Sequence, residues 1–319
     1  MHPALSVIFF TTASGAGYGL LALVGMLFIG NVPVSREAAL VAIVLGLGLV
    51  CFGLLSSTFH LGKPERSWRA FSQWRTSWLS REGVASVISF VPSLWLLWLL
   101  FDSTVIPDTV IPLAAAMTFM SVITVYCTAM IYRSLPTIHQ WHNALTVPCY
   151  TIFALMSGAV IFNAILSVMG SVDLNVTALT CLLCMWGLIL KRRYWSFIDT
   201  TRHSATPESA TGLGQLGENT GKVSQFEAPH SSENYLLKEM GFVVARNHAL
   251  KLRKLASILG FWLPFLFCGL SIVSNHNMTG TLLSVLAVVS LCIGMVIERW
   301  LFFAQARHVV TLYYGADAS

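Results

Sequence analysis

The stretch TLLSVLAVVSLCIGMVI (residues 281–297) carries no charge and is followed directly by Glu298 and Arg299. A helix rises about 1.5 Å per residue, so an apolar run of this length nearly covers the ~30 Å hydrocarbon core of a bilayer. Similar runs recur along the chain. Inside lipid each run must satisfy its own backbone hydrogen bonds, which only helices can do segment by segment. We therefore predict eight spanning helices, at about 4–29, 37–59, 84–103, 109–132, 145–170, 174–191, 252–274 and 280–303.

The composition supports an all-α integral membrane protein. Hydrophobic residues make up 55% of the chain and charged residues only 10%, which excludes an ordinary soluble domain. The N-terminal MHPALSVIFF has no basic region and no small-residue cleavage site, so we expect the first helix to be retained. The seven cysteines are scattered, mostly at membrane depth, and predict no disulfide framework. On the first helix, Gly15 and Gly19 form a small-xxx-small face that favours close helix packing.

The basic residues predict the orientation. Arg36 stands alone in the loops on one side, and the other eighteen of the nineteen Lys and Arg residues fall on the opposite side. With eight crossings both termini lie on the same side of the membrane, and this is the side with the eighteen basic residues. Positive charge accumulates on the cytoplasmic side of membrane proteins, so both termini are predicted to be cytoplasmic. The same rule accounts for the net charge of +5, so nucleic acid is not an expected partner. We expect lipid on the flanks and any soluble partner on the cytoplasmic face.

The chain divides into three parts. Residues 1–193 are predicted to hold helices one to six together with a loop at 60–83, and residues 251–319 to hold helices seven and eight and a cytoplasmic C-terminus. Between them, residues 194–250 form a long cytoplasmic loop. Its first part is rich in Ser, Thr, Gly and Pro, whereas NYLLKEMGFVVARNHALKLRK (residues 234–254) has the spacing of an interfacial helix. This loop is either a docking surface or a plain connector.

The segment best suited to chemistry is FHLGKPERSWRAFSQWRTSWLSREG (residues 59–83). Gly62 and Pro64 end helix two, which places His60 in its last turn near the depth of the lipid headgroups. Tryptophans here suit a segment lying flat in the interface, because an indole ring is buried there while its N–H stays bonded. Arg81 and Glu82 come where helix three enters the membrane.

These residues suit a quinone site. A quinone ring needs an apolar slot, each carbonyl oxygen needs a donor, and reduction requires protons that a histidine and a carboxylate can pass. The candidate quinone-binding residues are His60, Glu82, Arg75, Arg81 and Trp78. The alternative is structural: the arginines anchor the helix ends, His60 caps helix two, and Glu82 pairs with Arg81 or Arg75.

Other polar residues near the same face offer weaker signals. His139 and His142 could share a helical face as metal ligands, but a hydrogen-bonded role is favoured because no Cys or carboxylate stands beside them. Glu298 and Arg299 lie within a helix end, where unpaired charge is costly, so they mark either a functional site or a structural ion pair. No histidine pair brackets a haem, and Cys181 and Cys184 lack companion thiolates. We expect no haem, iron–sulfur cluster or metal in this chain.

The chain resembles the membrane anchor subunits of dimethyl-sulfoxide-reductase-type molybdoenzymes. These subunits belong to a wider group called DmsC/NrfD-like. The likeness rests on His60-Leu-Gly-Lys-Pro through Ser77-Trp-Leu-Ser-Arg-Glu82, on Glu298-Arg-Trp-Leu-Phe-Phe-Ala, and on His308-Val-Val-Thr-Leu-Tyr-Tyr-Gly. It implies an anchor for an iron–sulfur subunit and a molybdopterin catalytic subunit, exchanging electrons with ubiquinone or menaquinone in a bacterial inner membrane. The residues matching His60 and Glu82 are implicated there at the quinone site.

The cytoplasmic orientation and the long loop resemble, within this family, the cytoplasm-facing sulfite dehydrogenase anchors of the SoeC type. The resemblance therefore implies sulfite oxidation with electrons passed to quinone, and no residue of this chain would touch the sulfur substrate. The reverse flow, menaquinol oxidation driving a sulfoxide or sulfur-compound reductase, is the first alternative. A purely mechanical anchor and a transporter are the others, although the central helices lack the midplane polar groups of a transporter.

Overall fold

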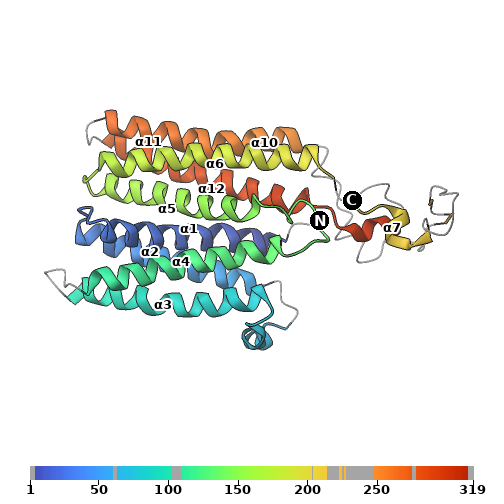
Figure 1. The fold of residues 1–319 in the computed structure, drawn as a ribbon. Helices are drawn as coiled ribbons and strands as arrows, with labels where there is room; N and C mark the ends of the chain where they lie inside the picture. Colours follow the sequence, from blue (N-terminus) through green and yellow to red (C-terminus); the bar gives the residue numbers. More distant parts are fainter. Residues whose placement is uncertain are drawn as a thin grey trace.

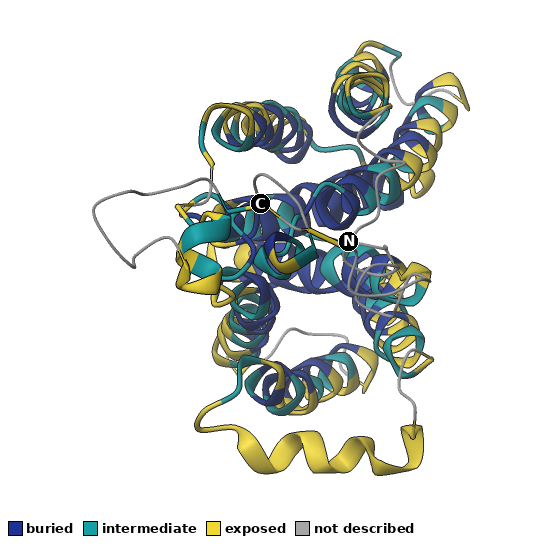
Figure 2. Ribbon diagram, turned by 90° about the vertical axis from the view of Figure 1, so that its right-hand side faces the viewer, coloured by how far each residue is buried: buried dark blue, intermediate teal, exposed yellow. Residues whose placement is uncertain are grey.

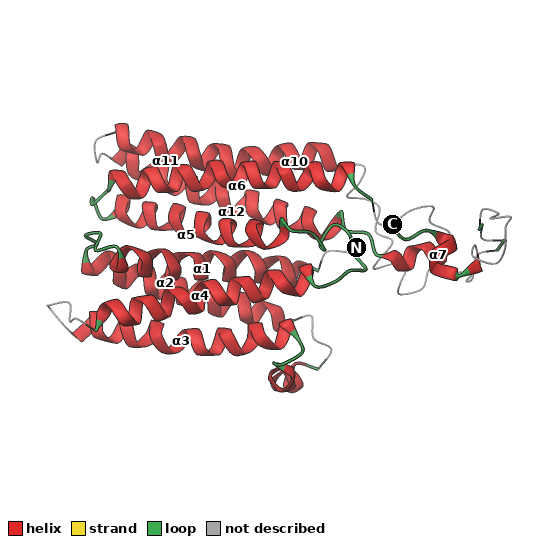
Figure 3. Ribbon diagram, viewed as in Figure 1, coloured by secondary structure: helices red, strands yellow, loops and turns green. Residues whose placement is uncertain are grey.

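The computed structural model describes residues 4–59, 63–102, 109–202, 204–213, 223–224, 226–227, 248–274 and 278–314, and all regular secondary structure in them is helical. Eight helices are long and apolar enough to span a membrane, which confirms the expected all-α, eight-span architecture (Figure 3). The spans are α1 (Leu5–Ile29), α2 (Arg36–Thr58), α3 (Trp78–Asp102), α4 (Val110–Arg133), α5 (Thr146–Val168), α6 (Leu174–Thr200), the seventh span Ala249–Val273 and α12 (Met278–Ala304).

The spanning helices run side by side along one axis, and α1 lies in the middle of them (Figure 1). Helix α1 packs against α2, α4, α5 and α12, while α5 also packs against α6 and α12. The end-on view shows α1 and α5 joining two groups of helices, one formed with α2 to α4 and the other with α6, α12 and the seventh span (Figure 2). The two groups also meet beside this junction, where Tyr132 of α4 packs against Phe302 and Phe303 of α12.

The α1–α5 crossing depends on two glycines. A Cβ atom on Gly19 would overlap the Ala154 carbonyl, and one on Gly158 would overlap the backbone of Gly19. Helix association in lipid gains little from apolar burial, so close backbone approach supplies the packing energy instead. The predicted packing role of Gly19 is confirmed. Gly15 differs, because a Cβ there would meet nothing within 4 Å.

The seventh span is not a continuous α-helix. It consists of α10 (Ala249–Ser257), a π-helical turn η3 (Ile258–Trp262) and α11 (Leu263–Val273). The hydroxyl of Ser290 on α12 donates a 2.8 Å hydrogen bond to the Leu259 carbonyl. A Cβ atom on Gly294 would overlap the backbone of Gly260 in this turn. The wider π turn thus brings the backbones of the seventh span and α12 into contact.

Two predicted helix boundaries were wrong by six or more residues. Helix α3 begins at Trp78 rather than at 84, and α6 continues to Thr200 rather than ending at 191. In both cases charged residues were taken as the end of the apolar segment. The helices instead run through those charges, because their buried faces continue beyond them.

A short helix lies across one end of the bundle. This is η1 (Pro64–Gln73), whose residues are all exposed and whose axis runs across the spanning helices (Figure 2). The Ser80 hydroxyl donates to the Ala70 carbonyl, and the ring of Phe71 covers Gly83, so η1 is attached to the start of α3.

Helices α7 (Pro207–Thr211) and η4 (Val309–Tyr314) extend beyond the same end (Figure 1). Most of the predicted interfacial helix at 234–254 lies outside the described residues, which resume at His248.

The glycine crossing predicts a specific effect of adding one methyl group. We expect Gly158→Ala to separate α1 from α5 and to destabilise the protein by about 1–3 kcal/mol, the usual cost of overpacking. Thermal unfolding of the detergent-solubilised protein, followed by tryptophan fluorescence, measures this change. Gly48→Ala on α2 is the matched control, since its Cβ meets nothing within 4 Å. Equal midpoints for the two variants would contradict the assigned role of the crossing.

Candidate functional site

Glu82 lies one turn inside α3, and its side chain is only 4% exposed. The Thr128 hydroxyl on α4 donates a hydrogen bond to its Oε1. No cation pairs with this carboxyl group among the residues that the structure describes. A buried carboxylate is costly unless it is paired, so the charge on Glu82 is poorly compensated by its immediate surroundings. This is the property expected of a carboxyl group that exchanges a proton.

Arg81 is directed away from Glu82. Its Nε donates to the Trp74 carbonyl at 3.0 Å and its Nη2 to the Arg75 carbonyl at 2.6 Å. Its guanidinium also lies over the Trp78 ring, 4.2 Å from the centroid. These contacts close the turn that leads from η1 into α3. The suggested ion pair of Glu82 with Arg81 or Arg75 is not found among the described residues.

The other candidate residues take different positions. Trp78 is half-buried and packs edge-on against Tyr126 of α4, with ring centroids 5.8 Å apart. It precedes Glu82 by four residues, so the two side chains leave the same face of α3. Arg75 is exposed beside Trp74. His60 lies outside the described residues. The structure therefore groups Trp78, Arg81 and Glu82 at the start of α3.

A second set of charges lies deeper in the bundle. Glu298 is fully buried, and it pairs with Lys191 of α6 through Oε1 and with Arg299 through Oε2, the latter at 3.0 Å. Lys191 and Arg299 are 1% and 4% exposed. The Lys191 Nζ lies 4.1 Å from the ring centroid of Tyr194, and the Arg299 guanidinium carbon 4.0 Å from that of Tyr150. Aromatic faces and one carboxylate thus hold two cations away from lipid.

Lys191 was not predicted as a buried residue, because the sequence placed it among the basic residues beside the end of helix six. It is buried because α6 continues for more than two further turns. A signal was present in the sequence. Positions along α6 that are buried follow helical spacing past the lysine, namely Cys184, Gly187, Leu188, Lys191, Tyr194 and Trp195. Glu298 and Arg299 form a buried ion pair, which was one of the two interpretations of this dipeptide.

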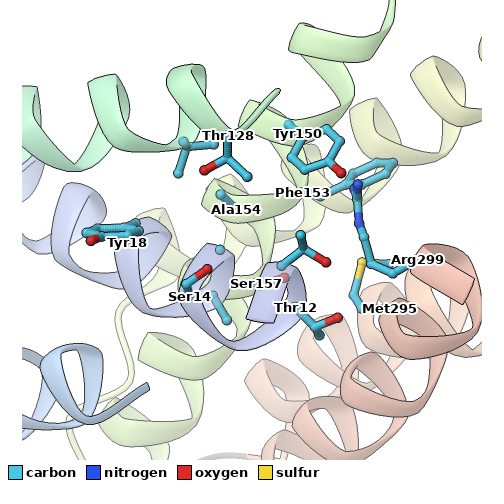
Figure 4. Close-up of a pocket in the computed structure, with 14 residues that line it drawn as sticks. Thr12, Ser14, Tyr18, Thr128, Tyr150, Phe153, Ala154, Ser157, Met295 and Arg299 are labelled. Atoms are coloured by element: carbon cyan, nitrogen blue, oxygen red, sulfur yellow. The ribbon is translucent and has the colours of Figure 1, made fainter. Parts of the chain in front are cut away.

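A cavity of about 30 Å³ lies between these two sets of charges (Figure 4). Thr128, the partner of Glu82, lines it from α4, and Arg299 lines it from α12. Helix α5 contributes Tyr150 and Ser157. The α1–α5 junction thus places one small polar space between Glu82 and the ion cluster.

His139, His142 and His308 each hydrogen-bond to a different residue. His139 Nε2 lies 2.8 Å from the Thr201 hydroxyl, whereas His142 Nδ1 lies 2.6 Å from the Arg133 carbonyl. Nδ1 of His308 accepts a hydrogen bond from the Val310 N–H, and partial burial lowers the pKa of this ring below its ordinary value. Within the described parts of the chain, no group of three or more His, Cys, Asp or Glu residues could hold a metal ion.

Comparisons with known proteins agree with the helical architecture. A family model described as DMSO reductase anchor subunit (DmsC) matches residues 1–315. The chain is 32% identical to a sulfite dehydrogenase subunit of Allochromatium vinosum over the full length of both proteins. It is also 31% identical to the anaerobic dimethyl sulfoxide reductase chain YnfH of Escherichia coli, over 37% of this chain and 41% of that one.

The ion cluster predicts unequal effects of removing its members. Glu298→Gln leaves two buried cations without a counter-charge, so we expect a loss of about 3–5 kcal/mol. Lys191→Met leaves the neutral Glu298–Arg299 pair and should cost clearly less. Unfolding midpoints of the purified complex measure both effects.

Arg253→Gln serves as a control, because it breaks the pair between Arg253 and the 54% exposed Asp199. Such a surface pair is worth below about 1 kcal/mol. If Glu298→Gln were no more harmful than Arg253→Gln, the cluster would not be a structural element of the bundle.

Proposed function

The chain belongs to the DMSO reductase anchor subunit (DmsC) family, and we propose that it is the quinone-reactive anchor of a sulfite dehydrogenase in a bacterial cytoplasmic membrane. As a member of this family, the protein is the membrane anchor subunit of a molybdoenzyme complex. In the proposal, a molybdopterin subunit oxidises sulfite, electrons pass through an iron–sulfur subunit, and this chain holds the quinone that receives them. No residue of this chain contacts the sulfur substrate.

The likeness to the sulfite dehydrogenase protein supports this substrate, because it extends over the whole of both chains. The likeness to the dimethyl sulfoxide reductase chain covers less than half of either protein. This shorter likeness is the observation behind the alternative function, in which quinol oxidation drives a reductase.

The charge distribution supports a cytoplasmic position for the partner subunits. Two of the basic residues counted toward the orientation, Lys191 and Arg299, are buried within the bundle and carry no information about sidedness. Without them, sixteen of the remaining seventeen basic residues still fall on the side of the termini. The positive-inside rule then gives a cytoplasmic location for η1 and the start of α3, where the iron–sulfur subunit would dock.

The residues at the start of α3 fit a quinone by their chemistry. Trp78 and Tyr126 supply aromatic surface at the bundle edge, and Glu82 supplies a carboxyl group one turn deeper on the same face. Quinone reduction takes up two protons together with two electrons. The Glu82 carboxyl is suited to hold one such proton, since Thr128 occupies only Oε1 and no salt bridge among the described residues fixes the charge. His60 is the second proton carrier in this proposal.

Arg81 positions the site rather than acting on protons. Its hydrogen bonds to the Trp74 and Arg75 carbonyls tie the end of η1 to α3. Its stacking on Trp78 fixes that ring at the entrance. Arg75, on the exposed surface, adds positive charge to the face on which the iron–sulfur subunit would dock.

Removal of the Glu82 carboxylate tests the quinone assignment. We expect Glu82→Gln to lower sulfite-dependent reduction of a quinone analogue about 100-fold or more, the usual contribution of a general acid or base. Sulfite oxidation with a soluble electron acceptor that takes electrons directly from the partner subunits should persist. Glu37→Gln, an exposed carboxylate at the opposite end of the bundle, is the matched control.

His60→Ala should reduce quinone-linked turnover in the same assay while the complex stays assembled. Full quinone-linked activity in both the Glu82 and His60 variants would remove the site and leave a mechanical anchor.

The direction of electron flow is tested with the purified complex. We expect sulfite to reduce a quinone analogue, because the chain matches the sulfite dehydrogenase protein along its whole length. In the parallel assay, a quinol analogue is supplied with dimethyl sulfoxide. Turnover in the second assay and none in the first would contradict the sulfite dehydrogenase function and support the reductase function instead.

A further inference from the structure

The cavity between Glu82 and the ion cluster has features that the proposed quinone site does not use. It is bounded by α1, α4, α5 and α12, and seven of its fourteen lining residues bear a hydroxyl group (Figure 4). The hydroxyl-bearing residues are Thr11, Thr12, Ser14, Tyr18, Thr128, Tyr150 and Ser157. These hydroxyl groups can hydrogen-bond to water, which favours water as the occupant.

The size of the cavity distinguishes water from larger ligands. A cavity needs about 10–15 Å³ to hold one water molecule, and each water needs two to four polar partners. The volume of about 30 Å³ therefore fits two or three waters.

Arg299 supplies an independent reason for an occupant. Its side chain is 4% exposed and lines the cavity, yet its Nη1 makes no hydrogen bond with any described residue. Tyr150 lies on the same wall, and its ring faces the Arg299 guanidinium. A buried donor left without a partner is costly, and more so when it is charged. Water in the cavity would accept a hydrogen bond from Arg299 Nη1.

The charges around the cavity favour proton movement in one direction. Lys191 and Arg299 outnumber Glu298, so the cluster at one end carries a formal charge of +1. At the other end, the Thr128 hydroxyl both lines the cavity and donates to Glu82. An arginine beside an internal water path repels excess protons. A proton in this cavity is therefore driven away from Arg299 and toward Glu82.

We propose that the cavity is a hydrated proton path, in which waters held by Arg299 and Tyr150 deliver protons to Glu82 through the Thr128 hydroxyl. In the transfer step, Thr128 gives its hydroxyl proton to a Glu82 oxygen and takes one from an adjacent hydronium ion, which is left as water, so one proton enters and one is delivered. This inference rests on the proposed function, since it supplies the proton that Glu82 hands on. It assigns Thr128 as the connecting residue and Arg299 as a positioning residue.

Thr128→Val tests the connection in the assembled three-subunit complex, because it keeps the side-chain shape and removes the hydroxyl. We expect quinone-linked sulfite oxidation to fall roughly tenfold, with a larger solvent deuterium isotope effect and an unchanged KM for the quinone analogue. Thr128→Ser should restore most of the rate. Thr118→Val is the matched control on the same helix, since Thr118 bonds to the Ala22 carbonyl and lies outside the cavity.

A second measurement does not depend on turnover. Infrared difference spectra of the complex, recorded after transfer into D₂O, follow deuterium exchange at the Glu82 carboxyl, which Glu82→Gln identifies by loss of the band. Exchange should be slowed by Thr128→Val and unaffected by Thr118→Val. A high-resolution map of the complex should show ordered water against Arg299.

The outcomes separate the two proposals. If Glu82→Gln and His60→Ala both leave quinone reduction intact, the proposed quinone site fails; if Glu82→Gln alone does so, the path loses its acceptor and is overturned. If Glu82→Gln is defective while Thr128→Val matches Thr118→Val in rate, isotope effect and carboxyl exchange, the hydrated path alone is overturned. A map in which a lipid chain fills the cavity would overturn it as well.

Discussion

Every polar group within the bilayer must find its partner inside the protein, and this constraint shapes the whole bundle. Serine and threonine hydroxyls on the spanning helices mostly bond back to carbonyls of the preceding turn, as Thr12 does with Ile8 and Ser93 with Ser89. Others connect helices, as in the bond from Ser290 to the Leu259 carbonyl. Charged groups meet the same requirement through the cluster of Lys191, Glu298 and Arg299.

Because lipid tails are as apolar as leucine, apolar contact alone does not select which helices pair. The selection here comes from the positions without side chains. Gly19 against Gly158 fixes the α1–α5 crossing, and Gly260 against Gly294 fixes the seventh span against α12. These crossings bring α1, α4, α5 and α12 around one polar cavity. Glycine packing and the polar interior are therefore two parts of the same arrangement.

The number and type of the helices could be predicted from the sequence, because bilayer thickness imposes a length that hydropathy reveals. The start of α3 and the end of α6 could not be predicted in this way. Helix α6 passes through Lys191 because aromatic residues beyond it, Tyr194 and Trp195, continue the buried face. Hydropathy averages over all faces of a helix, so a single buried cation resembles a helix end. The amphipathic spacing past the charge was the better indicator.

The site could be predicted only in part, for a related reason. Adjacent residues in the sequence suggested that Glu82 pairs with Arg81, yet in a helix consecutive side chains point in directions about 100° apart. Arg81 consequently turns back to carbonyls of the turn between η1 and α3, while Glu82 enters the interior toward α4. Its partner Thr128 is remote in sequence and carries no distinguishing motif. Contacts of this kind are set by helix pairing, which a single sequence does not specify.

The two buried glutamates show how surroundings divide roles between identical groups. Glu298 has a cation on each carboxylate oxygen, so its negative charge is required by its neighbours and its loss would leave them unbalanced. Glu82 has only a hydroxyl as donor among the described residues, so none of those neighbours requires the charge to be present. The first carboxylate can hold helices together but is poorly suited to accept a proton. The second can alternate between its two protonation states without disrupting an ion pair, and this freedom, rather than its position in the sequence, makes Glu82 the candidate for proton exchange.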